Sequence, residues 1–279
     1  MTLAVLCALL AAAAMHAGWN ALVRRDSDSN ATTVAVAGGG IVIGLVLAPI
    51  LPAIEPAAIP YVLGSSATHV LYYALVARAY RLGELSVVYP IMRGLAPLIV
   101  SVAATMFIEP ASLSLVVGAA VLGGGIVLLG ADGLRSSRAG IGAALLNALV
   151  IAGYTIIDGL GARASASPAA YTAWIEVGGG IATLAWQFSR NGSALARAVA
   201  KRAPIGLAGG AMSFGAYAIA LWAMTVAPIG AVAAVRESSV LFATAFGALV
   251  LHERFGARRW LSTALVLAGL IVVKVGSAG

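Results

Sequence analysis

The sequence between residues 84 and 106 reads ELSVVYPIMRGLAPLIVSVAATM, and one arginine, Arg93, interrupts its apolar centre. A run of about 20 mostly apolar residues is long enough to cross the hydrocarbon core of a membrane as a helix. A charged side chain at the centre of such a helix is costly and therefore marks a functional candidate. This stretch predicts a membrane helix that carries chemistry.

Nine further runs of this kind occupy most of the 279 residues. Hydrophobic residues make up 61% of the chain and charged residues only 10%, against about a quarter in soluble domains. This composition excludes a water-soluble enzyme, a nucleic-acid binder and a disordered protein. The ten expected spans cover residues 3–23, 31–52, 58–79, 84–106, 112–131, 140–160, 168–187, 204–225, 228–251 and 257–276.

The spans are rich in alanine, glycine and valine and do not alternate like strands, so we expect an all-α integral membrane fold rather than a barrel. Glycine pairs at helix spacing, Gly40–Gly44 and Gly206–Gly210, predict close contacts between helix backbones. The single cysteine, Cys7, excludes a disulfide framework.

The positive charges follow the loops between the expected spans. All but four of the 17 lysines and arginines fall on one side of the membrane; Arg163 and Lys274 fall on the other, and Arg93 and Arg236 lie within spans. Basic loops mark the cytoplasmic side. We therefore expect a multi-pass protein of a bacterial-type inner membrane, with both termini extracytoplasmic. The net charge of +7 then reflects the orientation of the chain in the membrane rather than nucleic-acid binding.

The chain also contains an internal repeat. Residues 69–130 resemble residues 214–274, with Arg93 aligned to Glu237 and Glu109 aligned to Glu253. The repeat unit of five spans is odd in number, so the second copy enters the membrane from the opposite side. Inverted repeats are typical of secondary transporters, which bind their substrate near the bilayer midplane. We predict two five-helix repeats, residues 1–135 and 136–279, with Glu109 outside and Glu253 inside.

Five short stretches of the sequence resemble a known family. They are His16-Ala17-Gly18-Trp19-Asn20-Ala21-Leu22, then Tyr89-Pro90-Ile91-Met92-Arg93-Gly94-Leu95-Ala96-Pro97-Leu98, and then Arg236-Glu237-Ser238-Ser239-Val240-Leu241-Phe242 with the following His252-Glu253-Arg254 and Arg258-Arg259-Trp260. Together they resemble the EamA branch of the drug/metabolite transporter (DMT) superfamily, and within it the YddG-type amino acid exporters. The resemblance spans the chain and implies a ten-helix, 5+5 inverted-repeat fold and export of small metabolites, often amino acids.

Arg93 has two interpretations from the residues themselves. A guanidinium binds a carboxylate through two parallel hydrogen bonds, so Arg93 is suited to hold the carboxylate of a substrate. Alternatively, Arg93 pairs with Glu237, its counterpart in the repeat, and locks the two halves together. We expect Pro90 to break the helix one turn before Arg93, because proline removes a backbone hydrogen bond.

The other candidates lie on expected spans. Glu176 is suited to bind an ammonium group or a proton, or to form a structural ion pair, whereas Asp158 is expected near the outer surface, solvated or paired with Arg163. Two helix faces with aromatic and polar side chains fit either a cavity wall or helix packing. The predicted substrate-binding or gating residues are His16, Trp19, Asn20, His69, Tyr72, Tyr89, Arg93, Glu176 and Glu237.

The sequence therefore predicts a secondary transporter that exports amino acids, aromatic ones among them, by alternating access. The alternative within the same class is an exporter of drugs or quaternary cations, for which an unpaired acidic residue such as Glu176 would be the discriminating feature. An intramembrane enzyme is the alternative from another class. There is no phosphate-binding loop, and we expect no catalytic residues, metal or cofactor. The expected partners are a small-molecule substrate and the lipid bilayer, in a monomer or weak homodimer without nucleic acid.

Overall fold

The computed structural model describes residues 1–83, 85–110, 112–129, 138–242, 245 and 256–276, and these residues form helices and connecting loops without a strand. The helices are α1 (Leu3–Arg25), α2 (Ser29–Leu47), the short η1 (Pro56–Ala58), α3 (Ile59–Leu82), α4 (Leu85–Phe107), α5 (Leu113–Leu129), α6 (Arg138–Ala164), α7 (Pro168–Ala200), α8 (Ala203–Val226), α9 (Ile229–Arg236) and α11 (Ala257–Gly276). The all-α class is confirmed for this part of the chain. Outside the described residues lie Arg135, His252, Glu253, Arg254 and residues 243–244 and 246–251 of the expected ninth span.

Several of these helices have the length and composition of membrane spans. Among the described residues, five helical segments are long and apolar enough to cross a bilayer: Leu3–Arg25, Ser29–Leu47, Val87–Phe107, Arg138–Ala164 and Ala203–Val226. Two shorter apolar segments are Leu113–Leu128 and Trp260–Gly276. Large apolar side chains such as Leu145, Leu146 and Leu149 of α6 are about half exposed, as lipid-facing residues are. The protein is therefore a multi-pass membrane protein.

The chain divides into two compact units. Unit 1 comprises Met1–Ala13, Leu71–Ile156 and Val226–Gly279, and unit 2 comprises Ala14–Val70 and Ile157–Thr225. Each unit takes residues from both of the repeats expected from the sequence.

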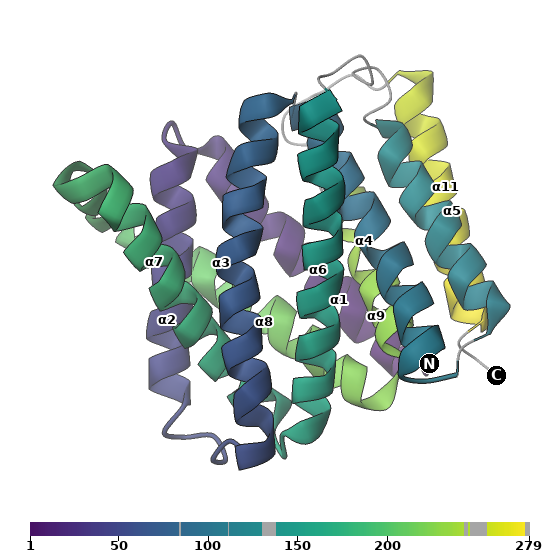
Figure 1. Ribbon diagram of the computed structural model, residues 1–279, viewed down its shortest axis with the longest axis horizontal. Coiled ribbons are helices and arrows are strands. Elements are labelled where there is room, and N and C mark those ends of the chain that lie inside the picture. Colours follow the sequence, from purple (N-terminus) through teal and green to yellow (C-terminus); the bar gives the residue numbers. More distant parts are fainter. Residues whose placement is uncertain (84, 111, 130–137, 243–244, 246–255, 277–279) are drawn as a thin grey trace. The chain divides into compact units, whose positions relative to one another are not determined.

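In unit 1, α5 and α11 lie side by side and run in opposite directions (Figure 1). Ser112, at the start of α5, donates a hydrogen bond to the carbonyl of Gly276 at the end of α11. Gly125 and Gly269 allow this close approach: a Cβ atom on Gly125 would lie 3.0 Å from the carbonyl oxygen of Ser262, and one on Gly269 would lie 2.5 Å from the amide nitrogen of Leu122. Small residues at such contacts allow helix backbones to pack closely in membranes.

In unit 2, α2 packs against α7, also in opposite directions (Figure 1). A Cβ atom on Gly44 would lie 2.8 Å from the carbonyl oxygen of Ala173, and one on Gly206 of α8 would lie 2.6 Å from the carbonyl oxygen of Ala35. The close backbone contacts expected at these glycine pairs are confirmed at Gly44, Gly206 and Gly210, whereas a Cβ atom on Gly40 would meet the carboxylate of Glu176.

α7 is longer than the span expected at residues 168–187. It continues to Ala200, but Gly192 within it has non-helical angles, with φ 60° and ψ −155°. This left-handed region is open to glycine at little cost. The chain therefore kinks at Gly192, and the last turns of α7 follow a new direction, where Leu195 packs against Ala31 and Val34 of α2.

An ion pair ties the α1–α2 loop to the residue before α8 in unit 2. The Nε and Nη2 atoms of Arg202 donate hydrogen bonds to Oδ1 of Asp26 at 2.9 and 2.7 Å. Asp28 in the same loop caps α2 by accepting a bond from the amide of Ala31 at 3.0 Å. The hydrogen bonds from Arg202 hold the pKa of the Asp26 carboxyl below its usual range.

Replacing Arg202 with glutamine is expected to lower the melting temperature near neutral pH and to have little effect in acid. The pKa of Asp26 is lower in the folded than in the unfolded chain, so the pair contributes stability above the unfolded pKa of about 3.9. This contribution is lost as the pH falls through the folded pKa. Melting temperatures of wild type, Arg202→Gln and the exposed control Arg197→Gln, measured from about pH 7 down to about pH 3, test this expectation. A difference between wild type and Arg202→Gln that stays constant over this range would contradict it.

Candidate functional site

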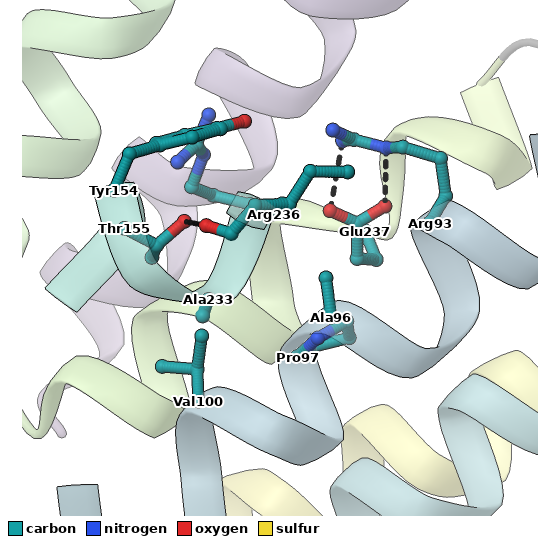
Figure 2. Close-up of a pocket in the computed structure, with 10 residues that line it drawn as sticks. Arg93, Ala96, Pro97, Val100, Tyr154, Thr155, Ala233, Arg236 and Glu237 are labelled. Carbon is teal, nitrogen blue, oxygen red and sulfur yellow. Dashed lines mark hydrogen bonds and ion pairs between the residues drawn. The ribbon is translucent and has the colours of Figure 1, made fainter. Parts of the chain in front are cut away.

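Arg93 of α4 and Glu237, the residue after α9, form a bidentate ion pair in unit 1 (Figure 2). The Nε atom of Arg93 donates to Oε2 of Glu237 at 3.1 Å, and its Nη2 atom lies 2.8 Å from Oε1. Both side chains are nearly buried, with exposed fractions of 12% and 8%. Pairing with Glu237 was one of the two interpretations of Arg93, and the structure confirms that the pair forms.

The break in the helices lies beside Glu237 and not at Pro90. α4 runs without interruption from Leu85 to Phe107 with Pro90 inside it, so the expected break there is wrong. Membrane helices tolerate proline when their surroundings satisfy the freed backbone group. α9 instead ends at Arg236, and the amides of Glu237 and Ser238 bond to carbonyls only three residues earlier. Glu237 therefore projects from a helix end.

The ion pair forms one wall of a small pocket that is partly open to solvent and has room for about one water molecule. In Figure 2, Arg93 and Glu237 point toward each other, and Arg236 and Tyr154 lie across the pocket from Arg93. Two guanidinium groups and one carboxylate thus line the same space. The lining residues are Arg93, Ala96, Pro97, Val100, Ile151, Tyr154, Thr155, Ala233, Arg236 and Glu237.

Tyr154 and Thr155 of α6 were not among the predicted site residues. One signal for Tyr154 was present, since Gly153-Tyr154 matches Gly18-Trp19 in the repeat. Tyr72, which was predicted, contacts Tyr154 edge to face, with ring centroids 5.8 Å apart, but does not line the pocket. Tyr89, also predicted, is 39% exposed on α4 and does not line it either.

His16, Trp19 and Asn20 form a contiguous group on α1 in unit 2. The rings of His16 and Trp19 meet edge to face at 5.2 Å. The Nδ2 atom of Asn20 donates to the carbonyl of His16 at 2.7 Å, so this amide is satisfied within its own helix. The buried indole Nε1 of Trp19 has no acceptor within the part of the chain that the structure describes.

The helix face expected to join His69 to Tyr72 is divided between the two units. His69 belongs to unit 2, where its Nδ1 atom lies 2.8 Å from the carbonyl oxygen of Ser65, and Tyr72 belongs to unit 1. The predicted site residues therefore fall into two sets. Tyr72, Tyr89, Arg93 and Glu237 lie in unit 1, and His16, Trp19, Asn20, His69 and Glu176 lie in unit 2.

Glu176 of α7 is a half-buried carboxylate at a close helix contact. A Cβ atom on Gly40 of α2 would lie 2.5 Å from its Oε2 atom, so the carboxylate lies directly over the backbone of α2. No described residue forms a hydrogen bond or ion pair with Glu176. The structural ion pair considered for this residue is therefore absent from the described part of the chain.

Asp158 of α6 differs most from its expected surroundings. It is fully buried rather than solvated, and it accepts hydrogen bonds from the hydroxyls of Tyr171, at 3.3 Å, and Tyr217. Arg163, its expected partner, instead donates to the carbonyl of Met224 at 2.7 Å. The expectation of an aspartate that is solvated or paired with Arg163 is therefore wrong.

Comparison with known proteins identifies part of the chain. Residues 138–275, just under half of it, match the EamA-like transporter family. A crystal structure titled only as that of a protein is 18% identical and has a TM-score of 0.74, with 96% of this chain and 98% of the other covered. At this identity, the likeness shows a shared fold alone. The search of curated proteins found no match. Residues 138–275 are thus similar to the EamA-like transporter family, which the motifs along the whole sequence also resemble.

Proposed function

We propose that this protein is a secondary transporter that exports small metabolites bearing a carboxylate, amino acids foremost, across the inner membrane by alternating access. The observation that carries the proposal is the pocket lined by Arg93, Arg236 and Glu237. Charged side chains within membrane helices are costly and mark substrate or ion pathways. The EamA-like domain over residues 138–275 supports a transporter of small molecules.

The charges of the pocket suit a free amino acid. The carboxylate of the substrate competes with Glu237 for the guanidinium of Arg93, where two parallel hydrogen bonds are available. The ammonium group of the substrate then compensates the released Glu237. Such an exchange leaves no buried charge without a partner, which matters because an uncompensated charge in the interior costs about 3–5 kcal/mol.

A second polar group beside the ion pair fits this proposal. The hydroxyl oxygen of Ser238, the residue after Glu237, is buried, and no described residue forms a hydrogen bond with it. Buried polar groups without a partner call for a ligand or a water molecule. Discontinuous helices in transporters expose such groups, together with backbone donors and acceptors, at the substrate site, and the chain leaves its helix at Glu237.

The proposed architecture is ten spans in two inverted five-helix repeats, with both termini extracytoplasmic. Contacts within unit 1 support it, because they recur in pairs at the 144-residue offset that separates Arg93 from Glu237. Gly125 faces Ser262 and Val266, and Gly269, its counterpart at that offset, faces Gly118 and Leu122, which are the counterparts of those two residues. A twofold axis between two repeats produces this reciprocity. A residue that contacts its own counterpart, as Arg93 contacts Glu237, lies on such an axis.

A flux assay tests the function. Purified protein in liposomes, given labelled amino acids one at a time, is expected to move at least one of them down its gradient, and protein-free liposomes provide the background. No flux for any amino acid would contradict the substrate assignment.

The carboxylate of Glu176, which forms no hydrogen bond or ion pair with a described residue, supports a second candidate, export of quaternary cations. A half-buried acidic group without a protein partner is suited to bind a cation that cannot donate hydrogen bonds. In this case, wild-type protein moves labelled tetraethylammonium, the variant Glu176→Gln loses most of that flux, and Glu55→Gln, at an exposed carboxylate, keeps it. Absence of tetraethylammonium flux in wild type, or equal flux in both variants, would contradict the second candidate.

A further inference from the structure

Asp158 is a buried carboxylate that the proposed amino acid site does not use. Its side chain belongs to unit 2, on the spanning helix α6, and has no exposed surface. One carboxylate oxygen accepts a hydrogen bond from Tyr171 of α7 and the other accepts one from Tyr217 of α8. Two hydroxyl donors, from two different helices, therefore converge on this carboxyl group.

No fixed positive charge balances Asp158. Among the described residues, no lysine or arginine forms an ion pair with it, and Arg163 of the same helix is bonded to the carbonyl of Met224. A buried ionised carboxylate that has only neutral donors carries a large desolvation cost, which taking up a proton removes. The group is therefore poised to change its protonation state when its surroundings change.

The groups around Asp158 are themselves able to exchange protons. From α3, His69 and Ser65 lie close enough to interact with Asp158 electrostatically, and the Nδ1 atom of His69 also lies 3.3 Å from the hydroxyl oxygen of Ser65. Tyr171 faces it from α7 and Tyr217 from α8. Ser65 and His69 thus add a hydroxyl and an imidazole from α3 to the polar surroundings of Asp158.

Packing holds this arrangement in place. A Cβ atom on Gly161, one turn after Asp158, would lie 2.2 Å from the hydroxyl oxygen of Tyr171. Only glycine at this position leaves space for the phenol to reach the carboxylate. The close packing of α6 against Tyr171 of α7 therefore positions the phenol hydroxyl at the carboxylate of Asp158.

We propose that Asp158, with Tyr171, Tyr217 and His69, forms a proton-binding site that couples export to proton movement. The carboxylate takes up one proton as an O–H bond and releases the same proton later in the cycle, so the charge of the site changes by one and no other bond forms or breaks. The coupling rests on the proposed transport function, whereas the binding of a proton at Asp158 does not.

The proton site is tested without any substrate. Infrared difference spectra of the purified protein in liposomes, recorded between about pH 4 and about pH 9, are expected to show a carboxylic acid band that titrates. Asp158→Asn removes this band, and Glu176→Gln, at the other embedded carboxylate of unit 2, keeps it. An unchanged band in Asp158→Asn would overturn the proposal.

A milder variant tests the same site in case Asp158→Asn fails to fold. Tyr217→Phe keeps the carboxyl group and removes one donor to its ionised form, so the midpoint of the titration moves up by about one pH unit. The exposed control Glu55→Gln leaves the midpoint where it is. A midpoint that does not move in Tyr217→Phe would contradict the proposed role of the tyrosines.

Coupling is tested in liposomes that contain a pH-sensitive dye, to which labelled amino acids are added one at a time. Wild type is expected to change the internal pH as it moves an amino acid. Against an opposing pH gradient, the amino acid flux through Asp158→Asn is expected to be at least tenfold slower than through wild type. Equal pH changes in both proteins overturn the coupling. If neither protein moves any amino acid, the proposed function fails, and the infrared spectra still decide the proton site.

Discussion

Replacing Arg93 with methionine is expected to lower the free energy of unfolding by about 3–5 kcal/mol, because it leaves a buried carboxylate unpaired. Glu237, only 8% exposed, accepts two contacts from Arg93 and loses both. The same substitution is expected to abolish transport, since it removes the guanidinium that we propose binds the substrate. Denaturant unfolding in detergent and flux in liposomes measure the two effects. The exposed Arg197→Met serves as the control and should change neither.

The double variant Arg93→Met/Glu237→Met separates stability from function. An apolar pair of similar volume often replaces a buried ion pair without loss of stability, so most of the lost free energy should return. Transport should not return, because the guanidinium is still missing. A double variant that transports at the wild-type rate would show that the pair is only a structural lock.

Replacing Gly39 with alanine is expected to cost about 3 kcal/mol or more, whereas the same change at the neighbouring Gly38 should be harmless. A Cβ atom on Gly39 would lie 2.1 Å from the carbonyl oxygen of Gly206 on α8, and one on Gly38 would meet nothing within 4 Å. Overpacking of a close contact costs about 1–3 kcal/mol or more when backbone must move. Alanine in place of an unhindered helical glycine gains about 0.5–1 kcal/mol.

Thermal unfolding of the two purified variants beside wild type tests this contrast. We expect Gly39→Ala to melt well below wild type and Gly38→Ala to melt at or slightly above it. Similar melting temperatures for both variants would mean that α2 and α8 do not pack as closely in unit 2 as the structure has them.

The sequence was sufficient to predict the helices and one of the long-range contacts. The apolar run at residues 257–276 coincides with α11, since apolar composition is the property that defines a membrane helix. The contact between Arg93 and Glu237 was an explicit alternative, because two embedded opposite charges occupy equivalent positions of a repeat. The end of α7 was not predicted, since its last turns are rich in alanine and arginine and continue a helix without being apolar enough for a span.

The surroundings of Asp158 were beyond what the sequence reveals. Its two hydroxyl donors lie 13 and 59 residues away along the chain and come from two other helices. No local spacing brings them together, and the nearby Arg163 offered a simpler partner that the structure assigns elsewhere. The break beside Glu237 was missed for a related reason: proline is a conspicuous breaking signal, whereas the end of α9 at Arg236 carries no such residue.

The central claim is that the charges around Arg93 select a substrate with a carboxylate, and one paired measurement tests it most directly. Liposomes containing the wild-type protein are given a labelled amino acid and, separately, the amine that remains after its carboxylate is removed. The account predicts flux of the amino acid, little or no flux of the amine, and loss of the amino acid flux in Arg93→Met. Flux of the amine that equals or exceeds that of the amino acid would contradict it.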